Sequence, residues 1–305
     1  MQLLGSCKVK NACVWCALDG KNIYIARARN ACMVLEALVS PESAVKSPWK
    51  IVVLGFVFAV LAVLVAYYSG LESTGVILVG LASIAAMPLM LSMVNYDVGW
   101  YEEQRFLGSR TLARHLPIVV VLAALFLGLT IGFLAWNLAL SPVEAQSVFD
   151  IQSKEVAAVA YMFQGHVLTF EQAFEKLFLH NLGVLVLITI FSIAYGAGSI
   201  AIITWNSSVI AVFLSAIARN AGGEYGLFTG LSAGILGIIP HGSFELAAYL
   251  VAALAGGVLS SGLLRRKELG GRLIIVLHDG AKLLAVGVLL LAIGAFIESN
   301  AIIFG

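Results

Sequence analysis

The stretch LGVLVLITIFSIAYGAGSIAIITWNSSVIAVFLSAIA, residues 182–218, decides the fold. It stays apolar over 37 residues, whereas about 20 apolar residues are enough for one helical crossing of a bilayer. Two polar or glycine-rich sites interrupt it, at Gly196-Ala197-Gly198 and at Trp205-Asn206-Ser207-Ser208. Because lipid does not tolerate exposed irregular backbone, we expect these interruptions to be breaks in membrane helices that face the interior of a bundle.

Composition extends this prediction to most of the chain. Of the 305 residues, 61% are hydrophobic and 11% are charged, compared with about 45–50% and about 25% in soluble domains. We therefore predict an all-α fold, a polytopic transmembrane helical bundle over residues 49–305 preceded by a polar segment at 1–48. The net charge of +1 gives no basic face for nucleic acid, so the bilayer is the expected partner.

The number of spans depends on two interrupted apolar stretches. Ordinary spans are expected at about 51–68, 74–94, 117–140 and 273–297. Besides residues 182–218, the run 227–264 is interrupted at Pro240-His241-Gly242. One crossing with a re-entrant hairpin, or three full crossings, would connect residue 178 to Arg265. The prediction is therefore five to seven spans, some of them broken or re-entrant, by the usual length of about 20 residues.

Charge distribution predicts the orientation in a plasma membrane. Residues 1–48 carry six Lys or Arg residues, whereas the loop 141–178 carries five acidic residues and only two lysines. Because Lys and Arg mark the cytoplasmic side, we expect a cytoplasmic N-terminus, an outer loop at 141–178 and a C-terminus outside. Within this loop, Thr169 and Gln172 have the spacing of a capping box, which predicts a helix at the outer interface leading into the next span.

The N-terminal segment is predicted to contain a β-hairpin within residues 9–28. Its turn signal is Asp19-Gly20-Lys21, between two strand-like runs. The four cysteines of the chain all lie in or near this segment, and a disulfide is not expected in a reducing compartment. Their spacing also gives no complete zinc set, so their role stays open; they are Cys7, Cys13, Cys16 and Cys32.

Ionisable side chains in the apolar segments are the candidate functional residues, because such groups are costly in lipid. His241 and Glu245 are four residues apart and share a helix face. A second group lies in the last span: His278, Asp279 and Lys282. The first face continues as a stripe of small residues that permits close helix packing, comprising Ala248, Ala252, Gly256 and Ser260. If this stripe packs against the last span, the five polar residues meet in one buried cluster.

Three interpretations of this cluster remain open. Its imidazole and carboxylate groups can bind a divalent metal, with His241, Glu245, His278 and Asp279 as candidate ligands, or they can relay protons in transport. Alternatively the residues are structural, with Asp279 and Lys282 neutralising each other and the other pair locking a broken helix. No H-E-x-x-H motif and no G-x-S-x-G motif occurs. No catalytic residue is therefore assigned, and no cofactor is expected unless a metal is bound.

Three stretches resemble the stage II sporulation protein M family in its archaeal-type form. They are LEALVSPESAVKSPWKIVVLGFVFA at 35–59, HNLGVLVLITIFSIAYGAGSIAIITWNSSVIAVFL at 180–214 and IPHGSFELAAYLVAALAGG at 239–257. The most specific piece is Pro240, His241, Gly242 and Glu245; Asn181, Gly196, Gly198 and Asn206 match other recurring family features.

The resemblance implies a membrane protein of around five spans that, in spore-forming bacteria, holds peptidoglycan-degrading partners at the membrane during engulfment. The expected role is therefore a membrane scaffold or remodelling component that self-associates or holds membrane-protein partners. A transporter or channel using the His/Glu cluster is the alternative. An intramembrane metal-dependent hydrolase ranks last.

Overall fold

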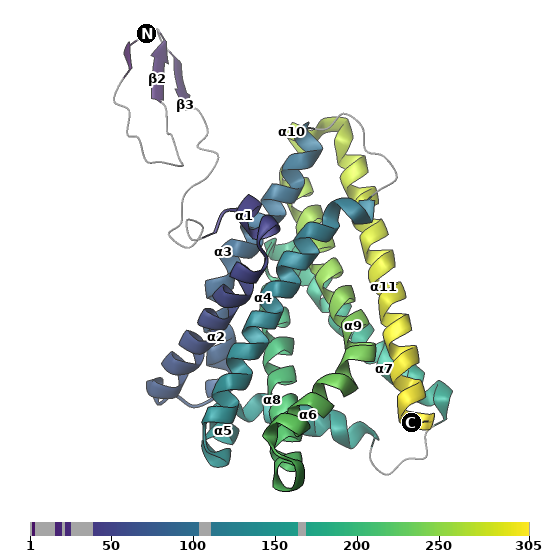
Figure 1. Ribbon diagram of the computed structural model, residues 1–305. Helices are drawn as coiled ribbons and strands as arrows, with labels where there is room; N and C mark the ends of the chain where they lie inside the picture. The colour runs from purple at the N-terminus through teal and green to yellow at the C-terminus, as the bar shows by residue number, and fades with distance from the viewer. Residues whose placement is uncertain are drawn as a thin grey trace. The chain divides into compact units, whose positions relative to one another are not determined.

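The computed structural model describes residues 2–3, 16–19, 22–25, 39–103, 111–163 and 169–304 (Figure 1). The chain divides into two compact units, Met1–Ser40 and Pro41–Gly305. In the first unit, β1 (Gln2–Leu3), β2 (Cys16–Asp19) and β3 (Asn22–Ile25) form an antiparallel sheet in that order. Asp19 pairs with Asn22, so two residues connect β2 to β3. The rest of the predicted hairpin lies outside the described residues. Cys7, Cys13 and Cys32 lie outside them as well.

The second unit consists of helices joined by short turns within its described residues. Seven of its helices are long and apolar enough to cross a membrane: α2 (Trp49–Ser69), α3 (Thr74–Glu103), α4 (Thr111–Ala139), α7 (Phe170–Tyr195), α8 (Ser199–Tyr225), α9 (Leu227–Leu264) and α11 (Leu273–Phe304). The shorter helices are α1 (Pro41–Lys46), α5 (Pro142–Val148), α6 (Asp150–Phe163), α10 (Arg266–Leu269) and the 3₁₀ turn η1 (Gly270–Arg272). The predicted all-α membrane bundle is confirmed, at the upper end of the predicted number of spans.

The three predicted interruptions have three different outcomes. Gly196 separates α7 from α8 with a φ of 71°, a conformation that glycine adopts without strain. By contrast, the predicted break at 205–208 is wrong: α8 continues through it. The side chains of Asn206 and Ser208 donate to carbonyls of their own helix, at Ile202 and Trp205. The helix α9 continues through Pro240 without ending and is bent along its length (Figure 1).

The predicted outer loop, residues 141–178, is mostly helical. The predicted capping box at Thr169 is present: its hydroxyl accepts from the Gln172 amide at 3.3 Å, and the Gln172 side chain accepts from the Thr169 amide at 3.1 Å. The helix that it starts, α7, runs without a break into the membrane span. A second capping box opens α5, where hydrogen bonds from the Ser141 side chain and backbone, and from Tyr67, hold the pKa of Glu144 below its usual value.

The second half of α9 is the central element of the bundle. Its residues 248–258 are all buried, and α3, α4, α7, α8 and α11 contact this helix. The stripe of small residues is buried as well. A Cβ added to Gly256 would lie 2.4 Å from the Ser192 Cβ and 3.0 Å from the Thr189 carbonyl oxygen, so the stripe packs closely against α7.

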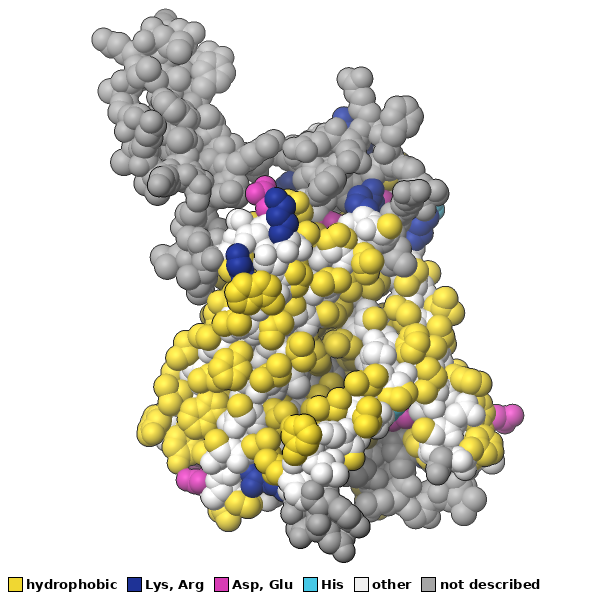
Figure 2. Space-filling view, viewed as in Figure 1, with side chains coloured by type: hydrophobic (Ala, Val, Ile, Leu, Met, Phe, Trp, Pro, Cys, Tyr) yellow, Lys and Arg dark blue, Asp and Glu magenta, His cyan; other side chains and the backbone are white. Residues whose placement is uncertain are grey.

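The surface of this unit is suited to lipid. Apolar side chains cover its middle, and most Lys and Arg side chains gather at the end that carries α1 and α10 (Figure 2). Large apolar residues are exposed on each of the seven long helices, for example Val53, Ile84, Leu187 and Leu289. Because a water-soluble surface rarely exposes apolar patches of this extent, the unit is embedded in a bilayer.

Candidate functional site

The bend of α9 places two of the predicted site residues against the end of α11. His241 Nε2 lies 3.9 Å from Glu298 Oε1. One turn further along α9, Glu245 packs over Gly294 of α11, where an added Cβ would lie 3.0 Å from the Glu245 Cγ. The two helices are antiparallel, and residues four apart share a helix face, so these residues form one continuous contact. The glycine provides the space for the Glu245 side chain.

Glu245 is held by a hydrogen-bond chain that begins on its own helix. The hydroxyl of Tyr249 donates to Asn181 Oδ1 at 2.9 Å, and Asn181 Nδ2 donates to Glu245 Oε1 at 2.6 Å. Asn181 and Tyr249 are both buried. A buried carboxyl group needs such a partner because its desolvation is costly. Asn181, which the family resemblance singled out, therefore fixes Glu245 and joins α7 to α9.

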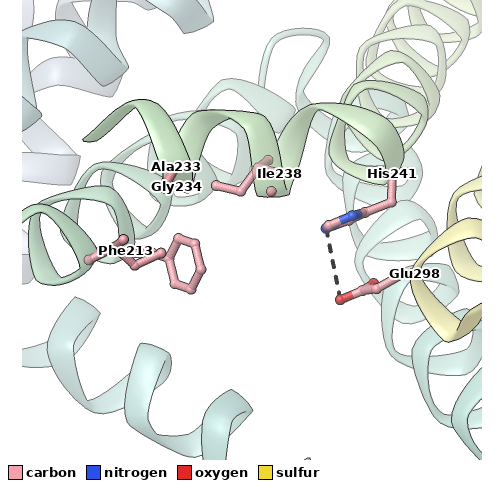
Figure 3. Close-up of a pocket in the computed structure, with 8 residues that line it drawn as sticks. Phe213, Ala233, Gly234, Ile238, His241 and Glu298 are labelled. Atoms are coloured by element: carbon pink, nitrogen blue, oxygen red, sulfur yellow. Dashed lines mark ion pairs between the residues drawn. The ribbon is translucent and has the colours of Figure 1, made fainter. Parts of the chain in front are cut away.

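A cavity of about 320 Å³ adjoins this contact. Its lining comes from α8, α9 and α11 and consists of Phe213, Ile217, Ala233, Gly234, Gly237, Ile238, His241 and Glu298. Figure 3 shows Phe213 and Ile238 on its apolar side and the His241–Glu298 contact at its polar end. The cavity therefore has an apolar body and one ionisable end, which is the general form of a small-ligand pocket.

The five predicted cluster residues do not meet. Gly280, next to Asp279, packs against Leu259, because an added Cβ would lie 2.6 Å from its side chain. Leu259 is 14 residues after Glu245 on α9, which corresponds to about 21 Å along a helix. The prediction assumed that the small-residue stripe packs against the last span. The stripe does contact the last span through Ala248, whose carbonyl oxygen would lie 3.4 Å from a Cβ added to Gly287, and it contacts α7 through Gly256. The polar groups stay apart because α9 and α11 are antiparallel and keep them at opposite ends.

The second group belongs to a separate charged network at the start of α11. Asp279 Oδ2 accepts from Arg114 at 2.5 Å, and Lys282 Nζ lies 3.8 Å from Asp279 Oδ1. Asp279 is buried, whereas His278 and Lys282 are exposed. This network ties α4 to α11 through charges of opposite sign, in agreement with the predicted neutralisation of Asp279 by Lys282 but with Arg114 as the closer partner.

The sequence alone predicts that His115 and His166 are ordinary interfacial or loop residues. His115 is instead fully buried, and its Nδ1 lies 2.9 Å from Asp97 Oδ1. The polar stretch 95–115 suggested a loop, but α3 extends to Glu103 and α4 begins at Thr111, so both partners are helical. His166, the other histidine in that prediction, lies outside the described residues.

The divalent-metal hypothesis finds no coordination sphere in the described part of the chain. No group of three or more His, Cys, Asp or Glu side chains there is arranged to hold a metal ion. The four candidate ligands divide between the two ends of α11, with His241 and Glu245 at one end and His278 and Asp279 at the other. Within the described residues, a metal would therefore lack the three or four ligands that it needs.

Two residues that matter most at the site, Glu298 and Phe213, were not predicted from the sequence. Glu298 was placed beyond the membrane because the last apolar run was ended at Ile297, whereas α11 continues to Phe304. Its spacing of four from Gly294 was the available signal, since it continues the face that meets Glu245. Phe213 could not be predicted as a cavity residue, because an aromatic residue in an apolar span is expected only to pack against its neighbours.

The fold and the site define a polytopic, all-α membrane protein whose central bent helix meets the last span at an ionisable cavity. The family model described as stage II sporulation protein M matches residues 119–301, more than half of the chain. The chain belongs to the stage II sporulation protein M family. Among proteins of curated function and among solved structures, none matches the chain. The matched range includes α7, α8, α9 and most of α11, and hence the cavity.

Proposed function

We propose that this protein is a membrane scaffold that holds partner membrane proteins and associates with copies of itself. The observation that carries the proposal is the closed half of the bundle around residues 248–258 of α9. There an added Cβ on Gly257 would lie 2.7 Å from Val94 and 3.2 Å from the Gly196 carbonyl oxygen. Helices in such close contact leave no room for a water-filled path, and they form a rigid body on which partners can be held.

The first half of α9 supplies a surface for a partner helix. Phe228 is 81% exposed and Leu236 is 69% exposed on this membrane segment. Both side chains therefore face lipid or a partner. This half-helix leads to Pro240 and carries four of the residues that line the cavity. A partner's membrane helix can replace lipid on this surface without rearranging the closed half.

Photocrosslinking in native membranes tests the scaffold. A photoreactive amino acid at Leu236 should yield a protein adduct of defined mass, either a second copy of this chain or one other membrane protein. The matched control is Ile84 on α3, which is 67% exposed and should yield only lipid adducts. Lipid adducts alone at both positions, in membranes that contain all natural partners, would contradict the scaffold.

A transporter or channel is the second candidate function, favoured by the His241–Glu298 contact within two membrane-spanning helices. Ionisable residues at such positions often mark transport paths. Proteoliposomes should distinguish the two functions: the scaffold predicts no solute or ion flux above that of empty liposomes. Flux that the folded double variant His241→Ala with Glu245→Ala abolishes would favour the transporter.

A further inference from the structure

The polar end of the cavity lacks hydrogen-bond partners within the described residues. Neither Glu298 nor His241 forms a hydrogen bond there, and the 3.9 Å between them is too long for one. Their side chains are 24% and 20% exposed. Glu245, by contrast, already accepts from Asn181 at 2.6 Å. The Glu298 carboxyl group is therefore the acceptor that is available to a ligand.

The charge around the cavity favours a cation. The Glu298 carboxyl group lies at this end, and no Lys or Arg is among the residues that line the cavity. Glu245 does not line the cavity, but it is one helical turn from His241 and adds a second carboxyl group nearby. The nearest basic residue along α8, Arg219, donates to the carbonyls of Asn137 and Leu140 at the end of α4. Its charge is thus directed to another helix. His241 is the one basic side chain in the lining, and a positive ligand meets no repulsion there while this imidazole is neutral.

The walls and the volume of the cavity indicate the apolar part and the size of the ligand. Its walls are the apolar side chains of Phe213, Ile217 and Ile238, with small residues between them. The aromatic ring of Phe213 can also attract a cation across its face. A volume of about 320 Å³ is at the lower end of the range of about 300–1,000 Å³ for ligand pockets, so the ligand is small.

We propose that this cavity binds a small organic cation, a protonated amine with a short apolar body, through the Glu298 carboxyl group. The amine can belong to a free solute or to the headgroup of an aminolipid, since both present the same ammonium group. The inference concerns binding alone and holds whether or not the ligand crosses the bilayer. It is also independent of the scaffold, because the cavity lies within one chain.

Binding of n-butylammonium to the full chain in phosphatidylglycerol nanodiscs tests the proposal. Calorimetry should show saturable binding, whereas n-butanol and butyrate should bind at least about tenfold more weakly. Glu298→Gln should weaken butylammonium binding by about tenfold or more, the effect of removing one charge-assisted hydrogen bond. Glu175→Gln, an exposed position on α7, should bind like the unchanged chain.

A cavity-filling variant tests the location independently of charge. An added Cβ on Gly237, which lines the cavity, would meet no atom within 4 Å, and the same holds for Gly183 on α7, which does not line it. Gly237→Leu should therefore remove binding while the protein stays folded, and Gly183→Leu should leave binding unchanged.

The outcomes separate the two sources of the amine and decide the proposal. Weaker butylammonium binding in mixed phosphatidylglycerol and phosphatidylethanolamine nanodiscs than in phosphatidylglycerol and phosphatidylcholine nanodiscs of equal charge identifies a competing lipid amine, and equal binding identifies a free amine; both support the site. Absence of saturable binding in phosphatidylglycerol, or equal binding of butanol or butyrate, overturns it. Normal binding by folded Glu298→Gln or by Gly237→Leu also overturns it. If Glu298→Gln does not fold, the comparison of Gly237→Leu with Gly183→Leu decides.

Discussion

Substituting Gly256 with alanine tests the close packing of α9 on α7. The added methyl group would lie 2.4 Å from the Ser192 Cβ and 3.0 Å from a backbone oxygen of α7. An ordinary contact begins near 3.4 Å, so the two helices must separate by about 1 Å. Overpacking of this kind costs about 1–3 kcal/mol. The neighbouring face of α9 offers no relief, because a Cβ added to Gly257 would lie 2.7 Å from Val94 and 3.2 Å from the Gly196 carbonyl oxygen.

The matched control is Gly80→Ala on α3, where an added Cβ would meet no atom within 4 Å. Both substitutions gain about 1 kcal/mol of helix propensity, so the difference between the two variants isolates the packing term. Unfolding by sodium dodecyl sulfate in mixed micelles, followed by tryptophan fluorescence, should show Gly256→Ala less stable than Gly80→Ala by about 1–3 kcal/mol. Equal stability of the two variants would refute the close packing, and Gly256→Leu should prevent folding altogether.

Three further predictions concern polar contacts. Asn181→Ala removes the donor to Glu245 and should lower the free energy of unfolding by about 1–3 kcal/mol; an unchanged value in the same titration contradicts that bond. Arg114→Gln removes the charge paired with buried Asp279 and should cost about 3 kcal/mol, and a thermal midpoint equal to that of the unchanged chain would argue against this pair. Because the folded pKa of Glu144 lies below its ordinary 4.5, its contribution to stability is complete above about pH 4.5 and is lost as the pH falls through the folded pKa. Carbon-13 titration of this carboxyl group should give a pKa below 4.5, and a higher value would contradict the capping geometry.

The fold class could be predicted from the sequence because apolar runs, capping signals and helix-ending glycines depend only on residues close together in the chain. Gly196 ends a helix through its own backbone freedom, and the capping box at Thr169 spans only four residues. Asn206 was misinterpreted because a polar side chain inside an apolar helix can satisfy itself on that helix. Contacts between helices could not be predicted, because spacing rules apply only within one helix. Arg114 and Asp279, for example, are 165 residues apart.

Which face of a helix is buried was easier to predict than which neighbouring helix covers that face. The small-residue face of α9 is buried as its pattern suggests, but spacing along one helix cannot show which neighbour covers it. Burial by another helix was also not predictable for Gln152. This residue is polar and lies in a polar stretch, so its sequence context suggests an exposed position suited to surface labelling. In the structure it is fully buried, and its amide donates to the Gly75 carbonyl and the Ser208 hydroxyl at 2.9 and 3.3 Å. Lys154, 78% exposed, is the suitable labelling position in the predicted outer loop.

Accessibility of single cysteines along α9 tests the central claim, a body closed in one half with a cavity in the other half, at the end of α11 that the charge distribution predicts to face outward. The native cysteines would be replaced, and a membrane-impermeant thiol reagent would be applied to either face of oriented membranes. We predict that Ile238→Cys, in the cavity, reacts from the outer side together with the marker Lys154→Cys. Ala255→Cys, in the closed half, should react from neither side. Reaction at Ala255→Cys, or reaction at Ile238→Cys from the cytoplasmic side alone, would contradict the account.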